Sequence, residues 1–263
     1  MRYKLAEDAK PQLAILLLAT VVTLILWFIP YAEYLVYPVR LFVTFIHESG
    51  HALVGFFTGG SVQSLTISPD GSGVVYSASP GFFSEILTSS AGYLGTTTFG
   101  VLLLLLIRKN VSPQKILLGA GAFIGLITLF FGVIAPVFNV FSLHVSFGSI
   151  LFTIVSGALI GFGLVVLAAY SNPRVANFAV AFLAVQCLLN AMLDLKNLFF
   201  INASFGGSEI QTDAGNMAKA TQVPAVMWVL IWMGISIVMI SLGLRLYAVA
   251  KNRGSQADLP FES

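Results

Sequence analysis

Three side chains within one short stretch have the types and spacing of a metal-dependent hydrolytic site. The stretch reads His47-Glu48-Ser49-Gly50-His51, which is the pattern H-E-x-x-H. Residues four apart lie on the same face of a helix, so two neutral imidazoles at these positions can share one Zn²⁺. Glu48 would lie beside the metal, where its carboxylate can take a proton from water. The alternative is a polar cluster that only forms hydrogen bonds between helices.

The surroundings of this motif favour the metal site. The motif interrupts an apolar run that extends over residues 38–58. Ionisable side chains in the middle of a membrane helix are costly, and by default they indicate a functional site. Three such residues so close together would be hard to tolerate without a metal ion to coordinate.

Two histidines are too few for a catalytic zinc, which usually has three protein ligands and an open fourth position. Our preferred third ligand is Asp194, in the apolar segment 176–200. This segment and the one that carries the histidines would run in the same direction, which puts Asp194 and His51 at similar depths. Asp213, beyond that segment, is the reserve ligand. The alternatives are an ion pair with Lys196 for Asp194 and a helix N-cap for Asp213.

Two further polar residues bear on the site. Asn190 lies one turn before Asp194 on the same helix face, so its amide can orient that carboxylate or bind a substrate carbonyl. Hydrogen bonding between helices explains Asn190 equally well. The remaining histidine, His144, lies in a short connection between apolar segments.

The composition indicates a protein of the membrane. Hydrophobic residues make up 57% of the 263 residues and charged residues only 9%, against roughly 25% charged residues in soluble domains. Such a chain could not cover a water-exposed surface, which argues against a soluble enzyme, a disordered protein or a nucleic-acid partner. The single cysteine, Cys187, excludes an intramolecular disulfide.

The elements that position these residues follow from the apolar runs. We predict an all-α polytopic membrane protein with about seven transmembrane helices, because lipid leaves an exposed backbone unsatisfied. Residues 1–250 would form one domain, followed by a polar tail at 251–263. The predicted helices cover residues 12–29, 38–58, 84–107, 116–138, 148–170, 176–200 and 224–248.

One connection differs from the others. Residues 61–77 are rich in β-formers on both sides of Pro69-Asp70-Gly71, which predicts a small β-hairpin between the second and third helices. A plain surface loop is the alternative. The orientation in the membrane stays open: the distribution of Lys and Arg favours an outside N-terminus, whereas the basic start resembles a signal anchor.

Several blocks of the sequence resemble the site-two-protease class of intramembrane zinc metallopeptidases, and most closely its bacterial subfamily B-like branch. Together these blocks cover about a third of the chain. They are HESGHALVGFFTGGSVQSLTISPDGSGVVY (47–76), AGYLG (91–95), LLNAMLDLKNLF (188–199) and TDAGNMAKATQVPAVMW (212–228).

This resemblance implies a zinc ion bound by His47, His51 and an aspartate, with Glu48 as the catalytic base. It implies cleavage of membrane-embedded or membrane-near proteins in a lipid bilayer, here a bacterial-type plasma membrane. The hairpin would act as an edge that pairs with an unwound substrate strand. Two other functions stay open. One is a proteolytically silent protein that binds membrane partners and keeps a structural zinc; the other is a cation or proton transporter.

Overall fold

The computed structural model describes residues 10–140, 145–204 and 212–248. Most of them are helical, and two short strands follow the second helix. The elements are α1 (Lys10–Phe28), α2 (Ala32–Phe57), β1 (Ser61–Ile67), β2 (Gly73–Ala78), α3 (Phe82–Arg108), α4 (Pro113–Ile127), the π-helix η2 (Thr128–Ile134), α5 (Ala135–Phe138), α6 (Phe147–Tyr170), α7 (Pro173–Ser204), α8 (Asp213–Thr221) and α9 (Ala225–Ala248).

All seven predicted segments are helical, but seven membrane crossings are not confirmed. Within the described residues, five helices are long and apolar enough to cross a bilayer: α3, the continuous helix α4–η2–α5, α6, α7 and α9. The apolar part of α1, Gln12–Leu26, is shorter than these five helices and does not count among them. Helix α2 is less apolar because it contains Glu33, Arg40 and the H-E-x-x-H motif.

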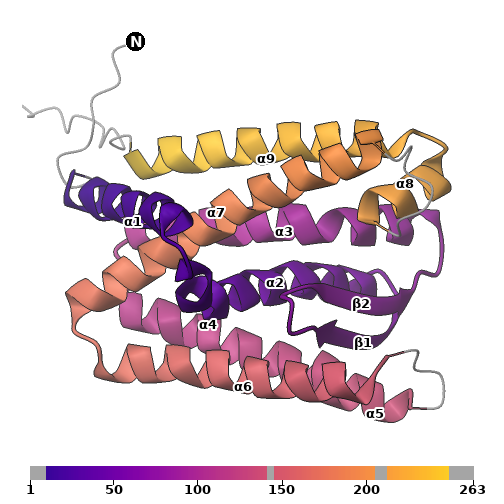
Figure 1. Ribbon diagram of the computed structural model, residues 1–263, viewed down its shortest axis with the longest axis horizontal. Coiled ribbons are helices and arrows are strands. Elements are labelled where there is room, and N and C mark those ends of the chain that lie inside the picture. The colour runs from indigo at the N-terminus through magenta and orange to yellow at the C-terminus, as the bar shows by residue number, and fades with distance from the viewer. Residues whose placement is uncertain (1–9, 141–144, 205–211, 249–263) are drawn as a thin grey trace, which may run out of the picture.

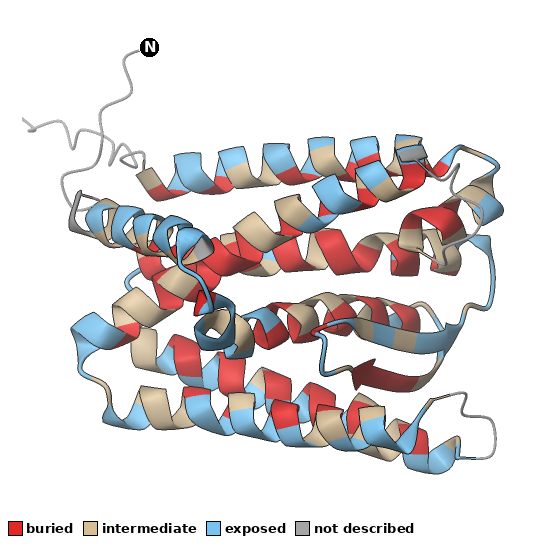
Figure 2. Cartoon of the chain, in the orientation of Figure 1, coloured by how far each residue is buried: buried red, intermediate tan, exposed pale blue. Residues whose placement is uncertain are grey.

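The helices form a bundle with α3 near its centre. Helix α3 packs against α2, α7 and α9, while α4 pairs with α6 and the hairpin lies between α2 and α6 (Figure 1). Buried residues concentrate on α2, α3 and α7, whereas few residues of α6 and α9 are buried (Figure 2). The exposed side chains of α6 and α9 include many large apolar ones, as expected of helices that face lipid.

The continuous helix α4–η2–α5 contains a π-helical stretch of seven residues just before Pro136. Proline lacks an N–H and its ring clashes with the carbonyl four residues earlier, which the wider π-turn relieves. Gly132 in this stretch lies against Thr153 of α6 and against the carbonyl of Leu65 in β1. The irregular helix therefore supports one side of the hairpin.

The predicted hairpin is present, and its two strands have different surroundings. Strand β1 is largely buried and β2 largely exposed. The turn is closed by a hydrogen bond from Ser72 N–H to the Asp70 carboxylate, at 2.9 Å, and by Gly71 at φ 84°. The strands are antiparallel, with an irregularity between Val62 and Ser64; the aligned pairs are Ser61/Ala78, Val62/Ser77, Ser64/Tyr76, Leu65/Val75, Thr66/Val74 and Ile67/Gly73.

The far edge of β1 is occupied, which leaves β2 as the open edge of the sheet. The backbone N–H of Ile67 donates to the Thr153 hydroxyl at 2.7 Å, away from β2. Opposed residues of an antiparallel pair direct their backbone groups alike, inward or outward. Gly73 is paired with Ile67, so its N–H and C=O point to the open side, and those of Val75 follow by alternation.

Candidate active site

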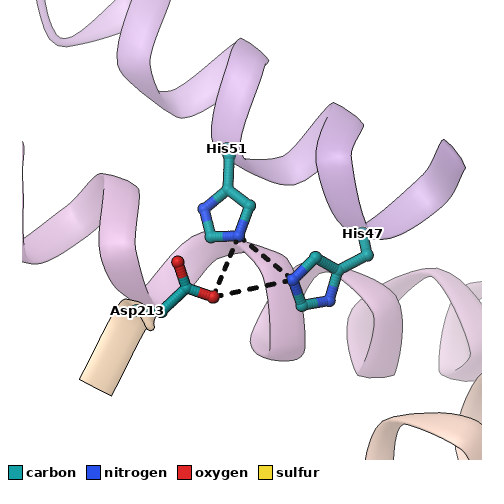
Figure 3. Close-up of side chains that lie close together, drawn as sticks. All are labelled: His47, His51 and Asp213. Atoms are coloured by element: carbon teal, nitrogen blue, oxygen red, sulfur yellow. Dashed lines mark hydrogen bonds and ion pairs between the residues drawn. The ribbon is translucent and has the colours of Figure 1, made fainter. Parts of the chain in front are cut away.

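Helix α2 presents both histidines to a carboxylate from a different part of the chain. The Nε2 atoms of His47 and His51 lie 3.7 and 3.3 Å from Oδ2 of Asp213, in the first turn of α8 (Figure 3). The two Nε2 atoms are 3.1 Å apart. All three potential ligand atoms lie within 4.8 Å of one another, the only such group of three His, Cys, Asp or Glu side chains within the described residues.

These distances fit one tetrahedral metal ion. With metal–ligand bonds of about 2.0–2.2 Å, two ligand atoms of a tetrahedral zinc site lie about 3.3 Å apart. The three measured separations, 3.1, 3.3 and 3.7 Å, lie close to that value. The donor set of two imidazoles and one carboxylate also leaves a fourth position open, as in catalytic zinc sites.

Helix α3 orients both imidazole rings. Nδ1 of His51 lies 2.7 Å from the Thr88 carbonyl oxygen, which can only accept, so Nδ1 carries the proton and Nε2 keeps its lone pair for the site. The His47 ring stands edge-on to Tyr93, with centroids 4.6 Å apart. Tyr93 in turn stacks on Trp232 of α9 at 5.6 Å. Both rings are therefore held by contacts outside their own helix.

Glycines make room for the site at the crossing of α2 and α3. A Cβ atom at Gly92 would overlap Nε2 of both His47 and His51. A Cβ atom at Gly50 would overlap the backbone of Ala91. The two helices can therefore approach this closely only without side chains at positions 50 and 92, which brings the rings against the α3 backbone.

Asp213 reaches the histidines because α8 begins at this residue. Thr212 is the N-cap of α8, since its hydroxyl accepts from Gly215 N–H at 3.0 Å; the alternative role of Asp213 as the N-cap is therefore wrong. Burial would raise the pKa of the Asp213 carboxyl. However, positive charge on His51 and hydrogen bonds to both histidines outweigh burial and hold this pKa well below its usual range.

Glu48 lies beside the three potential ligands but is not one of them. It is only 5% exposed and packs against Gly73 of β2, where a Cβ atom would lie 2.7 Å from Oε1 of Glu48. Its carboxylate has no hydrogen-bond partner within the described residues. The carboxylate oxygens are not fully buried either, since they are not among the fully buried polar atoms without a partner. The carboxylate therefore opens onto the pocket that Glu48 lines.

This pocket has a volume of about 710 Å³. Its walls come from α2, β2, α3, α7 and α8, so the motif, the open edge of the hairpin and Asp213 share one space. Gly73 and Val75, the β2 residues with outward-pointing backbone groups, both line it. A chain segment lying along β2 would thus lie in the same pocket as Glu48.

The structure does not bring Asp194, our preferred third ligand, to the histidines. Asp194 lines the same pocket from α7 but lies outside the group of potential metal ligands. Similar depth in the membrane brings Asp194 to the histidines only if α7 packs directly on α2. Instead α7 packs mainly on α3, and its C-terminal half runs beside α9 (Figure 1). The reserve residue, Asp213, occupies the position predicted for Asp194.

Asn190 also lines the pocket, but its amide N–H groups are engaged within α7. Its Nδ2 donates to the Gln186 carbonyl at 2.8 Å and to the Gln186 side chain at 3.1 Å. These bonds favour a structural role for Asn190 over contact with a substrate carbonyl.

His144 lies outside the described residues. The site contains three further residues: Thr88, Gly73 and Tyr93. No local sequence motif identifies any of them as functional.

Comparison with known families identifies the family of the chain. The family model described as Peptidase M50B-like matches residues 16–243. The chain therefore belongs to this family, the B-like branch of the site-two-protease family. Its five apolar helices and its family place it among integral membrane proteins. No curated protein and no solved structure matches the chain.

Proposed function

We propose that this protein is an intramembrane zinc metalloprotease that hydrolyses peptide bonds of membrane-embedded or membrane-near proteins. The observation that carries the proposal is the convergence of His47, His51 and Asp213 at distances suited to zinc, beside a carboxylate that opens onto the pocket. Membership of the Peptidase M50B-like family supports the same chemistry.

In this proposal His47, His51 and Asp213 hold the zinc ion. When bound, zinc supplies Lewis-acid activation of water and of the scissile carbonyl. The hydrogen bond from His51 Nδ1 to the Thr88 carbonyl fixes the tautomer that binds metal through Nε2. Asp194, across the same pocket, stays free for another role, such as contact with substrate.

Glu48 acts as the general base and then as the general acid. Its carboxylate takes a proton from water as the water oxygen bonds to the carbonyl carbon, and it returns a proton to the nitrogen as the C–N bond breaks. Its burial against Gly73 keeps the carboxylate in one place beside the potential metal ligands. Loss of such a group typically costs about 10²–10⁴-fold in rate.

Strand β2 would hold the substrate in an extended form. A helical substrate buries its carbonyls in its own hydrogen bonds, so it must unwind before hydrolysis. The outward N–H and C=O groups of Gly73 and Val75 offer hydrogen bonds to an added strand. Because Gly73 packs on Glu48, a strand paired here brings a peptide bond to the general base.

The test compares Glu48→Gln with Glu85→Gln, a glutamate in the first turn of α3 that lines the same pocket. Purified protein is incubated in detergent with a library of fluorophore-labelled transmembrane peptides, and new peptide termini are identified by mass spectrometry. We expect Glu48→Gln to retain zinc and lose cleavage by at least about 100-fold, and Glu85→Gln to retain both.

The same experiment separates the competing functions. Zinc in the wild type without cleavage of any peptide would favour a silent protein with a structural metal. Zinc flux into vesicles without cleavage would favour a transporter. Equal cleavage by wild type and Glu48→Gln would overturn the assignment of the general base.

A further inference from the structure

The hydrolysis proposed above needs a hydrogen-bond donor that the predicted residues do not supply. Charge develops on the carbonyl oxygen as water adds, and a preorganised donor at that oxygen often provides the largest single part of catalysis. Asn190 is the residue predicted for this task, but both acceptors near its Nδ2 belong to Gln186 in its own helix.

Tyr93 has the free donor that Asn190 lacks. Its side chain is 9% exposed, yet its hydroxyl makes no hydrogen bond within the described part of the chain. The hydroxyl oxygen is also not fully buried, since it is not among the fully buried polar atoms without a partner. The hydroxyl is therefore accessible, and Tyr93 lines the pocket.

The position of this phenol suits the reacting carbonyl. Tyr93 follows Gly92, the residue whose backbone lies against Nε2 of both histidines, and its ring meets that of His47 edge-on. The phenol is also close enough to the carboxylates of Asp213, Asp194 and Glu48 to interact with them electrostatically. It therefore shares the pocket with a potential metal ligand and with the general base.

The ring of Tyr93 is held rigidly, as a preorganised donor requires. Its ring stacks on Trp232 at 5.6 Å with an interplanar angle of 25°. The Trp232 indole is itself fixed, because its Nε1 donates to the Ser90 hydroxyl at 3.0 Å. Helices α3 and α9 thus fix the plane of the phenol, so little reorganisation is needed when charge develops.

We propose that Tyr93 is a catalytic residue whose hydroxyl donates a hydrogen bond to the substrate carbonyl oxygen as that oxygen becomes negatively charged. This inference rests on the proposed peptidase function and adds a residue that the H-E-x-x-H motif does not contain. Removal of one oxyanion donor typically costs about 10²–10³-fold in kcat.

The test uses Tyr93→Phe, which removes the hydroxyl and keeps the ring contacts with His47 and Trp232. The control is Tyr247→Phe, a buried tyrosine of α9 that does not line the pocket. Two readouts are measured on zinc-loaded protein in detergent. They are kcat and KM on a transmembrane peptide that the wild type cleaves, and the Kd of a phosphinic peptide, whose oxygens imitate the charged carbonyl oxygen.

We expect Tyr93→Phe to lower kcat by about 100-fold with KM nearly unchanged, and to weaken phosphinic peptide binding by at least about 10-fold. Its zinc content and Tm should equal those of Tyr247→Phe. Unchanged kcat and Kd in Tyr93→Phe, with Glu48→Gln inactive, would overturn this inference alone. A wild type that binds neither zinc nor the phosphinic peptide would overturn the proposed function and this inference with it.

A purely structural role for Tyr93 predicts a different pattern. Loss of packing would lower zinc content or Tm, and it would raise KM together with a fall in kcat. Such a result for Tyr93→Phe would also overturn the inference, because the hydroxyl would then act through the fold. Binding of a simple hydroxamate, which contacts the metal without forming a tetrahedral oxyanion, should be equal in wild type and Tyr93→Phe.

Discussion

Substitution of Gly92 by alanine should empty the metal site without changing any ligand. The added Cβ would lie 2.6 Å from Cε1 of His47 and closer still to Nε2 of both His47 and His51. Carbon atoms in contact prefer separations of about 3.5–4.0 Å, so the His47 ring would have to move by roughly 1 Å. Ligand distances in a metal site hold to within about 0.2 Å, several times less than that movement.

The rings cannot make this movement cheaply. His51 is tied to the Thr88 carbonyl at 2.7 Å, and His47 is packed edge-on against Tyr93. We therefore expect zinc affinity to fall by at least about 100-fold, the upper end of losses seen when groups that orient metal ligands are changed. Zinc content is measured by mass spectrometry after dialysis, and Kd by competition with a chromophoric chelator.

Gly95→Ala is the matched control, one turn later in α3. There the new Cβ would lie 3.5 Å from the Gly50 Cα, which is an ordinary contact. Both substitutions replace glycine by a better helix former, worth about 1 kcal/mol each, so helix propensity cannot explain a difference between them. A Gly92→Ala protein that binds one equivalent of zinc with wild-type affinity would refute the close approach of α3 to the two rings.

Two further predictions concern the acids and the hairpin. Asp213→Ala should lose zinc while Asp194→Ala keeps it; the reverse result in the same metal analysis would restore Asp194 as the third ligand. Gly73→Ala should retain zinc but slow peptide cleavage by at least about 10-fold, because its Cβ would displace the Glu48 carboxylate. Ser77→Ala, on the same strand, is its control, and equal cleavage rates in both variants would contradict the contact.

The sequence predicts the local parts of this structure well. Apolar runs determine where helices form in lipid, and turn residues such as Pro69 and Gly71 determine where the hairpin bends. The pairing of His47 with His51 also depends only on helical periodicity, so it is visible in the sequence. Each of these features depends on residues that are near one another along the chain.

The third potential ligand depends on how distant helices pack, which the sequence pattern does not give. Depth along a helix axis follows from residue count, and Asp194 does line the predicted pocket. Which helix lies next to α2 does not follow from residue count. Because α3 occupies that place, the carboxylate that meets the histidines comes from the short helix α8. No spacing in the sequence shows whether Asp213 or Asp194 meets the histidines.

The site therefore depends most on a helix that contributes no ligand to it. Helix α3 gives His51 its hydrogen-bond acceptor at Thr88, gives both rings their space at Gly92, and gives His47 its aromatic neighbour at Tyr93. Helix α8, which carries Asp213, packs on the same helix. The distances between the three potential ligands are thus set through α3, and changes along its inner face should alter metal binding more than changes of similar size on α7.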